Sequence, residues 1–166
     1  MDFDTDRLLL KANHMIKSIL YAYSDRDLKR VRHFMSEGCY QALLKHFEED
    51  DRLHRRMHYD EVRVTSLLNR MFETEEYYNI EVIASCNAYI WSEVEGQDAI
   101  EGSQERKSSF GMKALFVKRI DAQVQDVVRC QGCGSSFNIK QNGECPNCGR
   151  VYDLDKFDFI IQEMDF

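Results

Sequence analysis

The first fifty residues place apolar side chains at the spacing of amphipathic helices. Apolar residues recur every three or four positions over residues 5–23, after Asp and Thr side chains that can cap a first turn, and predict a long helix. A new cap and an apolar period from Leu28 to Met35 predict a short second helix. A third apolar stripe, from Tyr40 to Phe47, predicts another helix before a charged run. Three helices therefore precede everything else.

From about Val62 apolar residues often alternate with polar ones, and β-branched and aromatic side chains become dense, as strands require. We expect four strands, over residues 62–72, 77–93, 108–120 and 151–164. One face of the second strand is apolar throughout and carries Ile80, Val82, Ala84, Cys86, Ala88 and Ile90. The stretch from Gly96 to Ser109 is rich in charge, glycine and serine, and it predicts an exposed hairpin loop.

Helices followed by strands indicate an α+β fold. We expect the three N-terminal helices to pack on one face of a curved, mainly antiparallel four-stranded sheet, with one helix across its concave side. The length of 166 residues fits one ordinary domain rather than two. We assign residues 1–128 and 151–166 to this main domain and residues 129–150 to an insertion.

The insertion contains two Cys-x-x-Cys pairs, each followed by glycine. Their spacing is Cys130-x2-Cys133-x11-Cys145-x2-Cys148. Two residues between thiolates let one tight turn present both sulfurs to a single ion. Four thiolates suit Zn²⁺, with iron as the substitute, and leave no open position for a substrate, which predicts a structural metal. Two disulfides or four unpaired thiols are the alternatives, which the doubled pattern disfavours.

Between the two pairs, Asn142-Gly143 is a dipeptide preferred in hairpin turns. Residues 129–150 are thus predicted to form a zinc ribbon inserted before the last strand. The segment has three cationic residues, and a zinc ion bound by four thiolates would add two net negative charges. A ribbon of this charge favours a structural role or contact with protein over nucleic acid.

Composition and charge narrow the class of protein. With 43 % hydrophobic and 31 % charged residues, the chain has the composition of a globular protein. We find neither a membrane-spanning stretch nor a secretion signal, and expect a cytoplasmic protein. The net charge of −7 argues against nucleic-acid binding, which needs a basic face, although a ribbon that binds nucleic acid stays an alternative. Residues 1–60 are neutral, so the net negative charge lies beyond them.

Polar clusters outside the ribbon carry weaker signals. Two basic clusters comprise, first, Arg26, Lys29, Arg30, Arg32 and His33 and, second, Arg52, His54, Arg55, Arg56 and His58. We interpret them as solvated helix faces, or as cations for weak contact with anionic lipid. His54 and His58 are placed on one helical face, but no carboxylate motif accompanies them and we assign no metal site. The acidic run 48–51 is interpreted as solvated, and Cys39 and Cys86 as buried small apolar residues.

Short motifs outside the ribbon resemble one family. They are Asp2-Phe3-Asp4, Ala12 and Ile16, Tyr21-Ala22-Tyr23 before Asp25-Arg26-Asp27-Leu28, Phe34-Met35-Ser36-Glu37 before Tyr40 and Leu43, Val62-Arg63-Val64, Phe116-Val117-Lys118-Arg119, and Phe159, Ile161 and Met164. Through them the chain resembles the Tim forty-four-like domain family, which includes the mitochondrial inner-membrane translocase adaptor and bacterial relatives. Where the family tends to have tryptophan, this chain has Ala114 and Phe159, and the ribbon is an addition to the mitochondrial pattern.

The resemblance implies the cone-shaped α+β roll of the nuclear-transport-factor-two-like superfamily, with a pocket between sheet and helices. It implies a non-catalytic binding or scaffolding module that contacts a protein partner at the inner face of a membrane. The superfamily also includes enzymes, so a small-molecule enzyme that uses the pocket is the alternative function. Tyrosines available to line such a pocket are Tyr21, Tyr23, Tyr59 and Tyr89.

Overall fold

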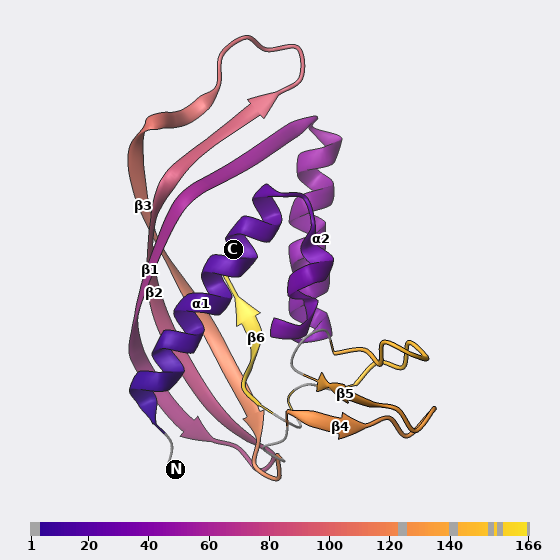
Figure 1. Cartoon of the computed structure of the whole chain (residues 1–166). Helices are drawn as coiled ribbons and strands as arrows, with labels where there is room; N and C mark the ends of the chain where they lie inside the picture. Colours follow the sequence, from indigo (N-terminus) through magenta and orange to yellow (C-terminus); the bar gives the residue numbers. More distant parts are fainter. Residues whose placement is uncertain (1–3, 123–125, 140–142, 153–154, 156–157, 166) are drawn as a thin grey trace.

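The computed structural model describes residues 4–122, 126–139, 143–152, 155 and 158–165. Three helices come first and strands follow, as predicted (Figure 1). The helices are α1 (Thr5–Ser24), the 3-10 helix η1 (Leu28–Phe34) and α2 (Glu37–Arg52). The strands are β1 (Arg55–Glu73), β2 (Tyr77–Val94), β3 (Glu101–Arg119), β4 (Val127–Arg129), β5 (Ser136–Asn138) and β6 (Ile160–Met164).

The main sheet has four antiparallel strands in the order β1-β2-β3-β6, which confirms the α+β class. Its three long strands are curved, and α1 crosses them (Figure 1). The pairing of the long strands is irregular at several points: β1 shifts register between Asp60 and Arg63, and β2 shifts between Ala88 and Ile90. Lys107 lies in the part of β3 opposite the second shift, and its Nζ donates to the carbonyl of Glu61, which lies in the first, at 3.0 Å. Bulges of this kind increase the local bend and twist of a sheet.

The core lies between the three helices and one face of the sheet. The predicted apolar face of β2 is confirmed, because its side chains from Ile80 to Ala88 are buried and Ile90 is half-buried. The buried face of α1 contributes Leu8, Ala12, Met15, Ile16, Ile19, Leu20, Ala22 and Tyr23. Burying apolar side chains at about 25 cal/mol per Å² is the main favourable contribution to such a fold.

The helix boundaries follow from caps and from one cross-connection. The Asp4 side chain accepts from the Arg7 N–H at 3.1 Å and begins α1, and Ser36 does the same for α2 with the Cys39 N–H at 3.2 Å. Between them η1 ends where the backbone turns to meet β6, because the Ser36 N–H donates to the Ile161 carbonyl at 2.8 Å. This contact joins the helical half to the last strand.

Several predicted strand boundaries are wrong. β1 begins at Arg55 rather than residue 62, and β3 begins at Glu101, so much of the predicted loop 96–109 is strand. The early part of β3 is largely exposed on both faces and so lacks alternation, whereas the early part of β1 is half-buried. The predicted strand 151–164 is strand only over 160–164; Val151 forms an isolated bridge with Glu144.

Candidate metal centre

The two cysteine pairs occupy two turns of the same geometry. Cys130 and Cys145 begin the turns, and the N–H groups of Gly134 and Gly149 donate to their respective carbonyls, both at 2.8 Å. Each of these glycines has φ of +78°, a conformation that costs other residues energy. Glycine is therefore the residue that suits this position in both turns. Asn142 of the predicted hairpin turn lies outside the described residues.

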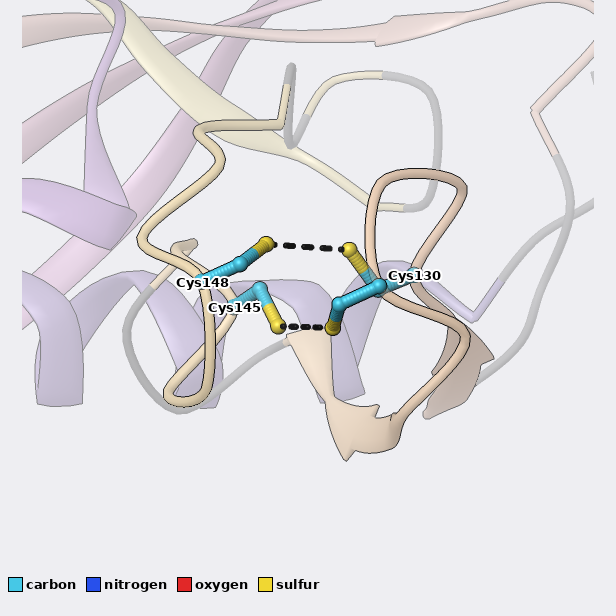
Figure 2. Close-up of side chains that lie close together, drawn as sticks. Cys130, Cys145 and Cys148 are labelled. Carbon is cyan, nitrogen blue, oxygen red and sulfur yellow. Dashed lines mark hydrogen bonds between the residues drawn. The ribbon is translucent and has the colours of Figure 1, made fainter.

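The turns bring four sulfurs into one cluster (Figure 2). All four Sγ atoms lie within 4.8 Å of one another. The separations are 3.5 Å between the Sγ atoms of Cys130 and Cys148 and 3.6 Å between those of Cys133 and Cys145. Tetrahedral zinc with Zn–S bonds of about 2.3 Å needs sulfurs roughly 3.8 Å apart, so the donor set fits this metal. The four residues can therefore hold a metal ion, with Cys130 and Cys145 buried and Cys133 and Cys148 exposed.

Hydrogen bonds favour the thiolate form at two of the four cysteines, Cys130 and Cys133. The Tyr152 hydroxyl donates to Cys130 Sγ at 3.3 Å, and with backbone N–H groups it lowers the pKa of Cys130 to about 7. Hydrogen bonds from the side chains of Asn147 and Ser135 lower the pKa of Cys133 to about 5. Metal ligation requires the thiolate, so these donors favour the ligating form.

Tyr152 is a residue of this centre that the motif alone does not mark. Its Oη also accepts from the Gln131 N–H at 2.9 Å, and its ring contacts Phe137 with centroids 5.5 Å apart. The hydroxyl thus connects the second part of the segment to the first cysteine turn. A tyrosine four residues after the last cysteine was its only sequence signal.

Changing Tyr152 to Phe should lower zinc affinity about tenfold, because outer-shell hydrogen bonds to metal ligands typically contribute this much. The ring and its contact with Phe137 remain, so the change isolates the hydroxyl. Competition with a chromophoric chelator measures the affinity, and the thiolate-to-metal absorption of the Co²⁺ form should shift. Tyr78→Phe, outside the segment, is the matched control. Equal affinity for both variants would show that the hydroxyl does not support the metal.

A small core of its own surrounds the centre, and an ion pair connects this segment to the main domain. It consists of Val128, Cys130, Phe137, Ile139 and Cys145, with Tyr152 packed against it. β4 and β5 form a separate two-stranded sheet there. Arg32 of η1 reaches Glu144, beside Cys145, with Nη1 and Oε1 3.3 Å apart. A change in the order of this segment on metal binding would therefore reach the helical half through the ion pair between Arg32 and Glu144.

The two remaining cysteines take no part in the cluster. Cys39 lies in α2 and Cys86 in β2, both buried as predicted. Burial raises the pKa of each thiol to about 11, which keeps it protonated and unreactive near neutral pH.

The predicted helical face for His54 and His58 is wrong. α2 ends at Arg52, His54 lies in the turn that follows, and His58 lies in β1. The His58 ring stacks on Trp91 with centroids 4.7 Å apart, and its Nε2 is 2.8 Å from Glu93 Oε2. Among the residues that the structure describes, the four cysteines alone group as possible metal ligands.

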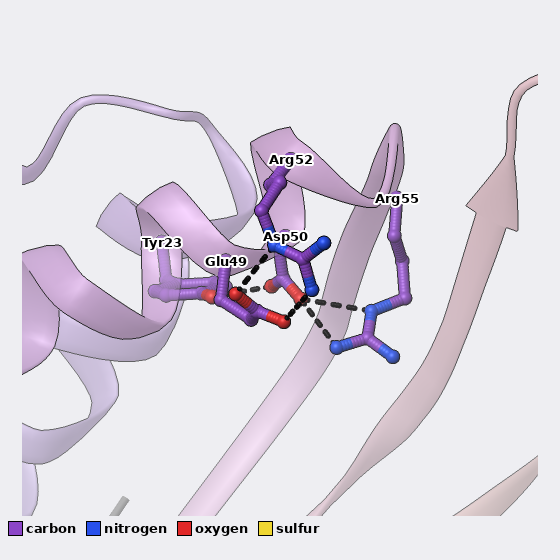
Figure 3. A network of polar contacts seen from close by, with 5 residues as sticks. All are labelled: Tyr23, Glu49, Asp50, Arg52 and Arg55. Atoms are coloured by element: carbon purple, nitrogen blue, oxygen red, sulfur yellow. Dashed lines mark hydrogen bonds and ion pairs between the residues drawn. The ribbon is translucent and has the colours of Figure 1, made fainter.

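The acidic run 48–51 was predicted to be solvated, and this is wrong for Asp50, which is buried. Its side chain accepts a hydrogen bond from the Tyr23 hydroxyl, and its Oδ1 accepts from Arg55 Nε and Nη2 at 2.8 and 2.6 Å (Figure 3). Burial and this hydrogen bond raise the pKa of Tyr23. Asp50 follows Leu43 by seven residues and Phe47 by three, a helical spacing that marks the inward face.

This buried pair lines a cavity of about 410 Å³ between the helices and the sheet. The family resemblance predicted a pocket here and made four tyrosines available to it, but neither Asp50 nor Arg55 was predicted to line it. The lining residues are Tyr23, His46, Glu49, Asp50, Arg55, Met57, Tyr59, Ile90, Phe110, Gly111, Met112 and Asp165. Of the four candidate tyrosines, Tyr23 and Tyr59 line the cavity, whereas the Tyr21 hydroxyl accepts from the Val62 N–H.

Comparison with known proteins adds no identification: no family model matches the chain, and no curated protein sequence matches it. No helix within the described residues is both long enough and apolar enough to cross a membrane.

Proposed function

We propose that the protein is a non-catalytic binding or scaffolding module, a cone-shaped roll of the Tim forty-four-like kind with a zinc ribbon over residues 129–150. The observation that carries this proposal is the donor set of the metal centre. Four cysteine thiols take all positions of a tetrahedral site and leave none for water or substrate. The ion then supports the shape of the module, and function belongs to the surfaces and cavity of the fold.

The proposed partner is a protein at the inner face of a membrane, as the family resemblance implies. Charge pairing favours protein over bare lipid. The arginines of the two basic clusters that have acidic partners are Arg26 with Asp51, Arg30 with Asp25, Arg32 with Glu37 and Glu144, Arg52 with Glu49, and Arg55 with Asp50. A paired cation adds little to lipid attraction, which amounts to about 1 kcal/mol for each free Lys or Arg at the surface.

Sedimentation with membrane vesicles tests this proposal. Zinc-loaded protein should sediment with vesicles that retain membrane proteins and lose that binding once the vesicles are treated with protease. Protein-free vesicles of anionic and of neutral lipid are the controls, at low and moderate salt. The variant Lys29→Ala/Arg56→Ala removes two cluster cations with no ion pair among the described residues, and should leave binding to the untreated vesicles intact.

If the parent protein binds protein-free anionic vesicles strongly and the double variant does not, the partner is anionic lipid and the proposal of a protein partner is wrong. Failure to bind any vesicle would contradict the membrane association itself. Neither result depends on the metal centre, because the zinc content of the sample is measured beforehand.

The cavity supports a second candidate function, the binding of a small molecule. An enzyme would need an acid or base free to exchange a proton with its substrate. Both Asp50 oxygens already have partners, since Oδ2 accepts from Tyr23 and Oδ1 from Arg55. We therefore propose ligand binding without acid–base chemistry at Asp50, and assign no catalytic residue.

A further inference from the structure

The cavity combines a charge-compensated polar cluster with an apolar lining. Tyr23, Asp50 and Arg55 form the polar cluster (Figure 3). The apolar part consists of Met57, Ile90, Phe110 and Met112. A volume of about 410 Å³ lies within the range of small-molecule sites, roughly 300–1,000 Å³. Such a lining suits a molecule with an apolar body and few polar atoms.

Tyr59 supplies a hydrogen-bond donor that the protein does not use. Its ring lies between Tyr23 and Phe110, with centroids 6.3 and 6.4 Å away. The Tyr59 backbone N–H donates to Ser24, but the hydroxyl has no partner among the described residues. Burial raises the pKa of Tyr59 to about 12, so the hydroxyl carries its proton at neutral pH. A ligand oxygen would satisfy this donor.

The charges of the lining disfavour an ionised ligand. Arg55, the arginine of this lining, is paired with Asp50 and is not free for an anionic group. The same pairing occupies the buried carboxylate that an ammonium group would need. Glu49 at the rim is paired with Arg52, and Asp165 adds a further negative charge there. The negative charge at the rim repels an anionic ligand. A cationic ligand would lack a carboxylate partner inside the cavity, because Asp50 is paired with Arg55.

We infer that the cavity binds an uncharged amphipathic molecule, with its apolar body against Met57, Ile90, Phe110 and Met112 and a hydroxyl or carbonyl oxygen on the Tyr59 hydroxyl. The inference rests on the second candidate function, a ligand-binding cavity. It goes further because it names the chemical class of the ligand and the residue that selects it. In an apolar site, a ligand with an oxygen that accepts the hydrogen bond of the Tyr59 hydroxyl binds more tightly than a ligand without one, because the donor is otherwise left unsatisfied.

Three probes of equal chain length separate the alternatives: 1-octanol, octanoate and octylammonium, titrated into the zinc-loaded full chain. Heteronuclear NMR shifts measure both affinity and location. We expect saturable binding of 1-octanol, with shifts at residues 57–59, 90 and 110–112, and binding of each ion at least about tenfold weaker. An uncompensated charge in a buried site costs more than the 1.4 kcal/mol that tenfold represents.

Two variants connect the binding to the named residues. Tyr59→Phe keeps the ring and should weaken 1-octanol about three- to tenfold, the range for one hydrogen bond. Tyr89→Phe is the matched control, because Tyr89 does not line the cavity, and it should bind as the parent does. Ile90→Trp fills the cavity and should abolish binding of all three probes.

The outcomes are distinct. Preferred binding of either ion, or unchanged affinity in Tyr59→Phe, would overturn the ligand class while leaving a binding cavity. Absence of saturable binding by every probe would overturn both this inference and the second candidate function. The metal-stabilised module would stand in either case, since its test is independent of the cavity.

Discussion

Replacing Cys145 with serine should abolish tight zinc binding and disorder the segment from β4 to Tyr152. A metal that closes a structural site of this size contributes about 10–16 kcal/mol to ordering it. Among the described residues, the local core that remains without the metal has five buried side chains, and two of these are the candidate ligands Cys130 and Cys145. Apolar burial on that scale does not hold a segment of this length in place.

The helices and the four-stranded sheet should persist, because their core lies outside this segment. Elemental analysis gives the metal content, with one zinc per chain expected for the parent, and amide exchange reports order residue by residue. Cys39→Ala is the matched control, a cysteine change away from the cluster that should keep the full metal content. Retention of metal by the Cys145 variant, or unchanged exchange protection after its loss, would refute a structural role.

Changing Asp50 to asparagine should destabilise the fold by about 3 kcal/mol. The side chain is only 8 % exposed, and Arg55 depends on it for two hydrogen bonds. Removing one partner of a buried ion pair leaves the other uncompensated and typically costs about 3–5 kcal/mol. The lower end applies because the Arg55 side chain keeps 34 % of its surface exposed to water.

Glu49→Gln provides the comparison from the preceding residue. Glu49 pairs with Arg52 on the exposed side of α2, and solvent and salt screen such pairs. Urea unfolding followed by far-UV circular dichroism measures both variants, and the Glu49 change should leave the midpoint nearly unchanged. If the two substitutions shift the urea midpoint equally, the buried ion pair of Asp50 contributes no more to the free energy of unfolding than the exposed pair of Glu49.

Patterns within short stretches of the sequence predicted much of the secondary structure. The predicted helix 5–23 corresponds to α1, because an amphipathic helix repeats its apolar face within the sequence itself. The apolar face of β2 followed from alternation for the same reason. The cluster of four cysteines was predicted, since each Cys-x-x-Cys turn is a local structure and two such turns can present their sulfurs to one ion.

Strand ends were predicted poorly where both faces of a hairpin meet solvent. β3 extends back to Glu101 through residues that are mostly exposed, and its pairing with β2 rather than its composition makes it a strand. His58 was likewise assigned to a helix and lies in β1, opposite Trp91. Backbone pairing between distant segments leaves little trace in hydrophobic periodicity.

Only the tertiary structure decided which polar residues are buried together. Asp50 belongs to an acidic run, yet it meets Tyr23 from α1 and Arg55 from β1. Tyr59 and Phe110 come from β1 and β3, and they border the same cavity. A buried carboxylate is tolerated only where the fold supplies its partners, and those partners are set by how helices and sheet pack. The sequence by itself determined the three helices, the apolar face of β2 and the four-cysteine cluster, because each of these signals lies within a short segment. The packing of the curved sheet against the helices decided which residues line the cavity.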